Sequence, residues 1–193
     1  MHLMEEKILN EGKVLPGQIL KVGNFLNQQI DTTFLRAMGE ETARLFADAG
    51  VNKVLTIEAS GIAIATAVGM AMNVPMVFAK KNKTSNVDGY VYSTVVHSYT
   101  HGTDYNVVVS CDYLTEKDRV LIVDDFLANG AALRGLCDLV KQAGAELCGC
   151  MTAIEKGFQG GGDALRKAGV RVESLAIIDA MDKDKIIFRS QAE

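Results

Sequence analysis

Two adjacent carboxylates, Asp124 and Asp125, directly follow the four apolar, β-forming residues 120–123. An apolar run of this length is typical of a strand that is buried on both faces in the middle of a parallel sheet. Ligands bind at the carboxyl ends of the strands in open parallel sheets, so both acids stand where chemistry is expected. Carboxylates in such a position accept hydrogen bonds from the hydroxyl groups of a sugar.

A loop of small residues comes next and leads into a helix. We expect the loop over residues 126–129, followed by Gly130 and a helix that starts at Ala131. Small residues let the loop backbone come close to a ligand, and the unpaired N–H groups of a helix N-terminus suit a phosphate. Acids beside a phosphate cradle therefore indicate a sugar phosphate as the ligand.

The segment from residue 120 to residue 132 resembles the phosphoribosyl diphosphate (PRPP) motif of the type I phosphoribosyltransferases. That motif consists of four apolar residues, two acids, two variable residues and a loop of small residues. A Walker B strand also ends in acids, but it needs an upstream G-x-x-x-x-G-K-[ST] loop, which the sequence lacks. The alternative without a function is a core strand that ends in two solvated acids.

The resemblance covers nearly the whole chain and implies a single α/β domain over residues 1–193 with the type I phosphoribosyltransferase fold. It implies a parallel core sheet flanked by helices and a small hood, formed by about residues 1–30 and the C-terminal strand. A flexible antiparallel hairpin is expected at about residues 81–111. Turn residues there flank a stretch with a period of two, which favours a projecting hairpin over a core element.

Hydrophobic periodicity and capping residues predict the other elements. Helices are expected over residues 4–10, 31–50 (from an Asp31 cap to a Gly50 cap), 62–72, 131–143 and 163–168. Strands are expected over residues 19–22, 53–58, 74–81, 147–155, 170–178 and 185–189. The glycine run at residues 160–162 lacks the G-K-[ST] end of a phosphate loop and is interpreted as a loop before a helix.

The resemblance implies that a nucleobase nitrogen displaces pyrophosphate from the anomeric carbon of PRPP. Asp124 and Asp125 would bind the ribose hydroxyls and orient a Mg²⁺ ion that arrives with PRPP, largely through water. Some relatives carry an acid in the loop that could accept the proton of the base, and Ala128 stands at that place here. The 5′-phosphate would be bound through the backbone of five residues: Ala128, Asn129, Gly130, Ala131 and Ala132.

Two further segments match places where the family binds pyrophosphate. The turn E-A-S-G ends a strand, and its Ser60 and Gly61 would offer N–H groups, although Ser60 is as readily the N-cap of the next helix. Lys80 and Lys81 end the following strand and on their own would be a solvated basic turn. The resemblance implies that they clamp pyrophosphate, with Lys81 in a catalytic role, when the hairpin closes as a lid and excludes water.

Three segments most closely resemble the members of this family that use xanthine. They are I-L-K-V-x-x-F-L-N-x-Q-I near the N-terminus, D-D-F-L-A-N-G, and I-E-K-x-F. They imply base contacts from Leu20, Asn27 and Lys156. A cationic donor would favour xanthine, which carries an oxygen at C2, over guanine, which carries an amino donor there. Phe126 would either stack on the purine or pack in the core.

The composition of the chain excludes several classes of binding partner. A net charge of −4 and a pI near 5.4 argue against nucleic-acid and anionic-membrane binding. The four cysteines form no C-x-x-C pair and are interpreted as reduced thiols. No apolar run approaches the roughly 18 residues that a membrane span needs. His97 and His101 lack a third ligand, so we expect no metal site of the protein's own. A cytoplasmic enzyme with PRPP and xanthine as substrates is therefore expected.

Two alternatives stay open. A purine phosphoribosyltransferase for guanine, hypoxanthine or adenine would differ only in its base contacts. A PRPP-sensing regulator without catalysis would share the core and a D-D-F motif, but we would expect a DNA-binding module ahead of the core. Here the first core helix is expected to begin by Asp31. Members of the family are commonly homodimers, so a homodimer is expected as well.

Overall fold

A computed structural model describes residues 2–81, 89–98, 103–183 and 185–191. Its helices are α1 (His2–Glu11), α2 (Thr32–Leu45), α3 (Gly61–Met72), α4 (Ala131–Gln142) and α5 (Gly161–Lys167), with a π-helical turn η1 (Gly23–Asn27) and a 3-10 turn η2 (Gly157–Gln159). Its strands are β1 (Lys13–Leu15), β2 (Ile19–Lys21), β3 (Lys53–Ile57), β4 (Met76–Lys81), β5 (Val91–Ser98), β6 (Thr103–Ser110), β7 (Arg119–Leu127), β8 (Glu146–Lys156), β9 (Val172–Asp182) and β10 (Lys185–Phe188).

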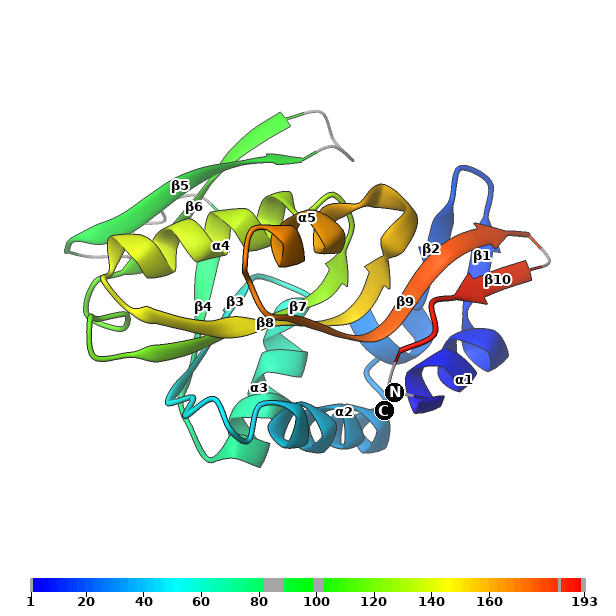
Figure 1. The fold of residues 1–193 in the computed structure, drawn as a ribbon, viewed down its shortest axis with the longest axis horizontal. Coiled ribbons are helices and arrows are strands. Elements are labelled where there is room, and N and C mark those ends of the chain that lie inside the picture. Colours follow the sequence, from blue (N-terminus) through cyan, green and yellow to red (C-terminus); the bar gives the residue numbers. More distant parts are fainter. Residues whose placement is uncertain (1, 82–88, 99–102, 184, 192–193) are drawn as a thin grey trace.

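The core is an eight-stranded sheet with the order β10-β9-β8-β7-β3-β4-β6-β5. Strands β4, β3, β7, β8 and β9 run parallel, and the strands at both edges pair antiparallel. Helices α4 and α5 lie on one face, and α2 and α3 lie on the other (Figure 1). The expected α/β class with a parallel core sheet flanked by helices is confirmed.

The motif strand β7 is buried on both faces, as its apolar run predicts. Val120 and Ile122 pack in the apolar cluster that includes α4, whereas Leu121 and Val123 pack in the cluster that includes α2 and α3. All four side chains are fully buried. Alternate residues of a strand point to opposite faces, so each helical layer receives two of them. This burial anchors the strand whose far end carries the two acids.

The N-terminal segment packs as a small layer at one end of the sheet, where β1 and β2 form a separate antiparallel pair (Figure 1). Met4 and Ile8 of α1 are fully buried in the same cluster as Phe25 and Leu26. The Lys7 ammonium group binds the carboxylates of Glu11 and Asp31, each at 2.7 Å. We call residues 2–30 the hood.

Helix α2 begins as predicted but ends earlier. Asp31 caps it by accepting a hydrogen bond from Phe34 N at 3.0 Å. The helix ends at Leu45 rather than at Gly50. Two arginines far along the chain donate to carbonyl groups here: Arg171 donates to Leu45 O, in the last residue of the helix, at 2.7 Å, and Arg119 donates to Ala49 O, in the turn beyond the helix, at 2.9 Å. These contacts satisfy carbonyl groups that would otherwise accept from a continuing helix.

The hairpin of β5 and β6 is antiparallel as predicted, but the expectation that it only projects from the core is wrong. Val96 and Val107 are buried in the cluster with α4, and β6 also pairs with β4. The apolar face of the hairpin therefore covers one edge of the core. Residues 82–88 and 99–102, including Tyr99 and His101, lie outside the described part.

Strand β7 is longer than the apolar run indicates. It continues through both acids to Leu127, where Phe126 pairs with Ile154 and Leu127 with Glu155 of β8. The predicted loop at 126–129 is therefore shorter, because the long strand β8 supplies partners as far as residue 155. The remaining predicted boundaries agree within a few residues. All four cysteines are free thiols, as expected. In the described part of the chain, no helix is long and apolar enough to cross a membrane.

Candidate active site

Four neighbouring parallel strands bring the predicted site residues to one edge of the sheet. In spatial order these strands are β8, β7, β3 and β4. Lys156 ends β8, the two acids lie near the end of β7, the E-A-S-G turn follows β3, and Lys80 and Lys81 end β4. Because parallel strands end at the same edge, residues from four separate segments face one ligand site.

The two acids differ in their environments. Asp124 is only 5% exposed, and its Oδ1 accepts a hydrogen bond from Asp125 N at 2.9 Å. Burial, together with the neighbouring Asp125 carboxylate, holds the pKa of Asp124 well above its ordinary value, and Lys81 acts in the opposite direction. Asp125 is half-buried and accepts from Phe126 N at 3.0 Å. A cation bound beside the pair would favour the carboxylate form of Asp124.

The turn after β3 lies directly against these acids. A Cβ atom at Gly61 would lie 2.1 Å from Thr56 Oγ1 and 3.4 Å from Asp124 Oδ1, so only glycine fits there. Thr56 Oγ1 is buried and has no hydrogen-bond partner among the described residues. Ser60 stands at the N-cap position of α3, as the alternative reading expected, but its side chain makes no capping hydrogen bond.

The end of β4 is tied to the same turn. Lys81 N donates a hydrogen bond to Glu58 Oε1 at 2.6 Å. The ammonium group of Lys81 lies 5.4 Å from the centre of the Tyr105 ring on β6. Lys80 is half-buried and Lys81 is exposed, so both lie where β4 meets the base of the hairpin.

The loop between β7 and α4 is braced from three sides. Gly130 has a φ of +83°, which favours glycine, and Asn129 Oδ1 accepts from Ala131 N at 2.9 Å. Arg134 donates to Asn129 O at 2.9 Å, and Gly161 N donates to Ala128 O at 3.2 Å. Ala132 lies in the first turn of α4, whose N–H groups have no partner within the helix.

Lys156 reaches from the core to the hood. Its ammonium group donates to Gln18 O at 3.0 Å and lies 6.0 Å from the centre of the Phe126 ring. Burial lowers the pKa of Lys156 below its ordinary value. Leu20 is buried in the hood core at 7% exposure, and Asn27 is exposed at the end of η1. The structure therefore brings Lys156 and Phe126 together, whereas no described hydrogen bond joins Asn27 to either of them.

Sequence analysis missed a buried ion pair next to Lys156. Glu155 is 0% exposed, and its two carboxylate oxygens accept from Arg166 of α5 at 2.9 and 2.7 Å. Ser174 Oγ donates to the same carboxylate at 2.5 Å. The signal that was available is the charged residue at the end of the apolar strand T-A-I-E, because an isolated charge is seldom buried without a partner.

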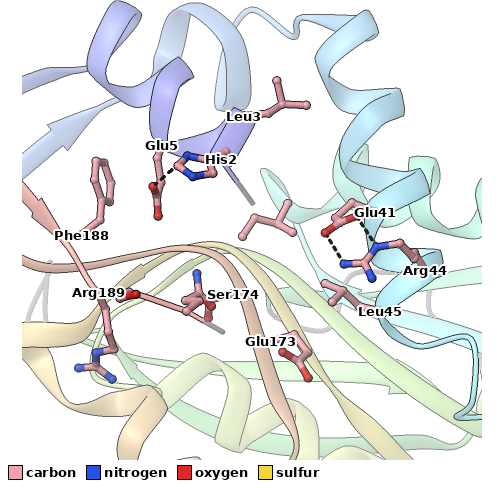
Figure 2. A pocket seen from close by; sticks show the side chains of 13 residues that line it. His2, Leu3, Glu5, Glu41, Arg44, Leu45, Glu173, Ser174, Phe188 and Arg189 are labelled. Atoms are coloured by element: carbon pink, nitrogen blue, oxygen red, sulfur yellow. Dashed lines mark hydrogen bonds and ion pairs between the residues drawn. The ribbon is translucent and has the colours of Figure 1, made fainter. Parts of the chain in front are cut away.

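A sizeable cavity among the described residues lies elsewhere. It has a volume of about 780 Å³ and is enclosed by α1, α2, β9 and the segment after β10 (Figure 2). Glu41 and Arg44 pair with each other there, and Arg189 is held by Asp163 and Asp179. None of the predicted site residues lines this cavity. The sheet edge, rather than the cavity, is the candidate active site.

The acids at the sheet edge fit a metal ion that arrives with a substrate. Among the described residues, no group of three or more His, Cys, Asp or Glu side chains could hold a metal ion by itself. Mg²⁺ prefers oxygen ligands, keeps several waters and is usually bound through one or two carboxylates together with substrate phosphates. Asp124 and Asp125 supply carboxylates of that kind.

Comparison with known proteins agrees with this geometry. A family model described as "Phosphoribosyl transferase domain" matches residues 27–184. The chain is 53% identical over 190 residues to xanthine phosphoribosyltransferase 1 of Clostridium perfringens, covering 98% of this chain and 100% of that protein. It is 51% identical over 190 residues to xanthine phosphoribosyltransferase 2 of Clostridium botulinum, with the same coverage.

Among solved structures, the fold is similar to that of an adenine phosphoribosyltransferase from Giardia lamblia in complex with 9-deazaadenine. The TM-score is 0.77 at 21% identity, and the match covers 90% of this chain and 96% of that one. At this identity the similarity concerns the fold alone.

Proposed function

This chain belongs to the phosphoribosyl transferase domain family, and from that premise we propose that it transfers the phosphoribosyl group of PRPP to xanthine. The products are xanthosine 5′-monophosphate and pyrophosphate, and the reaction serves purine salvage. The observation that carries the proposal is the row of four strand ends, at which two acids, a loop before a helix N-terminus and a half-buried lysine lie on neighbouring strands.

PRPP is proposed to bind across β3, β7 and α4. The 5′-phosphate would lie on the backbone of residues 128–132, at the N-terminal end of α4. In the structure, Asn129 Oδ1 accepts from Ala131 N, so one N–H group of this loop is already turned toward an oxygen acceptor. A phosphate oxygen would take over that hydrogen bond.

Ribose and pyrophosphate are assigned to the neighbouring segments. Asp124 and Asp125 would bind the ribose hydroxyls and water ligands of a Mg²⁺ ion, which supplies positive charge to the pyrophosphate when it is bound. Ser60, Gly61 and Lys80 would bind pyrophosphate, and Lys81 would stabilise the negative charge that develops on it as it leaves.

The bond changes follow from these positions. A nitrogen of xanthine bonds to the anomeric carbon, the bond from that carbon to pyrophosphate breaks, and pyrophosphate leaves with the electron pair. The attacking base releases its proton to water or to the departing pyrophosphate, because Ala128 offers no carboxylate to accept it. The residues of this chain therefore act mainly by positioning the reactants and by stabilising the leaving group.

Base selection is assigned to Lys156, Phe126, Leu20 and Asn27. The Lys156 ammonium group would donate to the oxygen at C2 of xanthine, and the amino group of guanine would instead oppose it. Phe126 lies within 6.0 Å of that ammonium group, which suits stacking on the purine. Leu20 would supply shape from the hood.

The assembly and compartment are proposals of the same kind. We propose a cytoplasmic homodimer, in line with the free thiols and with exposed apolar residues around the hairpin such as Tyr90, Val95 and Tyr113. Light scattering coupled to size-exclusion chromatography would report a mass of either one or two chains.

The testing experiment is an assay of pyrophosphate release with PRPP and Mg²⁺ that compares xanthine, guanine, hypoxanthine and adenine. We expect a clear preference for xanthine. A preference for another purine would keep the reaction but overturn the role of Lys156. No turnover with any base, despite measurable PRPP binding, would indicate a PRPP sensor.

A further inference from the structure

Helix α5 contacts both halves of the candidate site, although it contributes no residue to either. At its start, Gly161 lies against the phosphate loop: an added Cβ would be 2.3 Å from Ala128 O and 2.5 Å from Gly130 N. The next residue, Gly162, lies against the end of β8, where an added Cβ would be 2.1 Å from Glu155 Oε1. The glycine run interpreted as a plain loop thus lets one helix pack on two ligand-binding segments at once.

The contact with β8 is a buried and fully paired carboxylate. Arg166 of α5 binds both oxygens of Glu155, and the hydrogen bond raises the pKa of Arg166. Ser174 of β9 donates to one of these oxygens and also contacts Thr152 Oγ1 at 3.1 Å. Ser174 also lines the 780 Å³ cavity of Figure 2. The carboxylate is therefore held by two neighbouring elements.

Glu155 and Lys156 are consecutive residues at the end of one strand, so their side chains point to opposite faces of the sheet. Glu155 points to the α5 face, where Arg166 and Ser174 hold it. Lys156 points to the hood, where it donates to Gln18 O. Because Glu155 is held by three hydrogen bonds, the backbone that carries Lys156 has a defined direction.

We propose that Glu155 is a positioning residue whose ion pair with Arg166 makes α5 a common support beneath the 5′-phosphate loop and the base-binding lysine. Loss of the pair loosens both contacts of α5, and the affinities for PRPP and for xanthine fall together. This inference rests on the proposed function for the identity of the two ligands. The inference goes beyond the proposed function because it assigns a role to Glu155, which touches neither PRPP nor xanthine.

The decisive variant is Glu155→Gln, which keeps the shape of the side chain and removes its charge. We expect the KM values for PRPP and xanthine each to rise about tenfold, with a smaller change in kcat, because displaced supporting groups typically cost that much. A merely structural role would lower the amount of active enzyme and leave both KM values unchanged. Glu155→Asp keeps the charge and should recover part of each KM.

A matched control lies at the opposite edge of the sheet. Asp118 is also buried, and its carboxylate pairs with Lys53 Nζ at 3.0 Å. Because Asp118 is remote from the candidate site, Asp118→Asn should leave both KM values within about twofold of the wild type. Should Glu155→Gln not fold, Ser174→Ala removes one hydrogen bond to the same carboxylate. It should raise both KM values by about two- to threefold, the effect of one such bond.

The outcomes separate this inference from the proposed function. A rise in only one KM value, or in neither, would overturn the common support. If the wild type does not turn over xanthine, the proposed function fails. The support is then tested by calorimetry with PRPP and Mg²⁺ alone. In that titration Glu155→Gln must weaken PRPP binding, whereas Asp118→Asn must not.

Discussion

The ammonium group of Lys156 lies 3.0 Å from the main-chain oxygen of Gln18 and donates a hydrogen bond to it. Gln18 lies in the turn between β1 and β2 and has a φ of +59°, so the turn itself directs this carbonyl group. An ammonium group has three donor hydrogens, and the bond to Gln18 leaves two for a ligand. The contact therefore fixes the lysine without using up its capacity to bind a base.

Replacement of Lys156 with methionine should remove xanthine selectivity. Hydrogen bonds to charged groups contribute about 1.5–3 kcal/mol, so kcat/KM for xanthine should fall roughly 10- to 100-fold in Lys156→Met. The KM for PRPP should stay within about twofold, because the phosphate loop is untouched. Initial rates with xanthine and with guanine would measure the change. Lys141→Met, on the exposed side of α4, is the control and should behave as the wild type does. Equal losses with xanthine and guanine would contradict the prediction.

The KM for xanthine should rise at alkaline pH. Burial lowers the pKa of Lys156 below the ordinary value of 10.5, so the ammonium group loses its proton earlier than an exposed lysine does. Each loss of the proton removes the charged donor for the base. In Lys156→Arg the guanidinium group stays charged throughout, and this rise should be absent. A pH profile of KM for both proteins cancels the titration of xanthine itself, and identical profiles would refute the role of the lysine.

Much of the sheet edge could be predicted from sequence because local signals define strand ends. The apolar run at residues 120–123 indicates a strand buried on both faces, and the acids that follow it must lie at the carboxyl edge. The same reasoning places Lys80, Lys81 and Lys156, each at the end of an apolar strand. Parallel pairing then brings these residues together without any knowledge of side-chain contacts.

The features that sequence analysis missed depend on contacts between distant segments. Helix α2 ends at Leu45, where the Arg171 side chain, 126 residues away, donates to the Leu45 carbonyl oxygen, and helix propensity carries no information about such a contact. The support from α5 likewise depends on Gly161 meeting Ala128 and on Arg166 meeting Glu155. A glycine run and a lone acid are visible in the sequence, but their partners are set only by the packing of α5 on β8.

The contact between α3 and β3 should make Gly61→Ala destabilising. The new methyl group would lie 2.1 Å from Thr56 Oγ1, and overpacking of this kind typically costs about 1–3 kcal/mol. Thr56→Ala in the same chain removes the obstructing hydroxyl and should recover at least half of the loss. Urea unfolding of the two single variants and the double variant measures this coupling. Simple additivity of the two changes would mean that the contact does not set the cost.

The buried acid of the site should make the ligand-free protein less stable as the pH rises through the weakly acidic range. Burial and Asp125 raise the pKa of Asp124 well above its ordinary 3.8, so between these two values the folded state binds more protons than the unfolded state. The free energy of unfolding therefore falls with rising pH in this window. The stabilisation from protonated Asp124 is fully present below the pKa of this residue in the unfolded state, and it is lost as the pH rises through its pKa in the folded state. A protonated Asp124 costs less to bury than a carboxylate does.

Asp124→Asn removes the charge of the side chain and keeps its shape, so we expect it to abolish turnover. The same change should stabilise the ligand-free protein at neutral pH by about 1–2 kcal/mol, because residues kept for function often cost stability. The gain should shrink as the pH falls toward 3.8, because the raised pKa means that the buried wild-type side chain is already protonated there. Urea unfolding across this range, without PRPP or Mg²⁺, measures both effects. Asp118→Asn breaks the ion pair with Lys53 and should instead be destabilising at neutral pH. If Asp124→Asn instead lost as much stability at pH 7 as Asp118→Asn does, the folded protein would stabilise Asp124 as a carboxylate. That result would contradict the raised pKa expected from its burial.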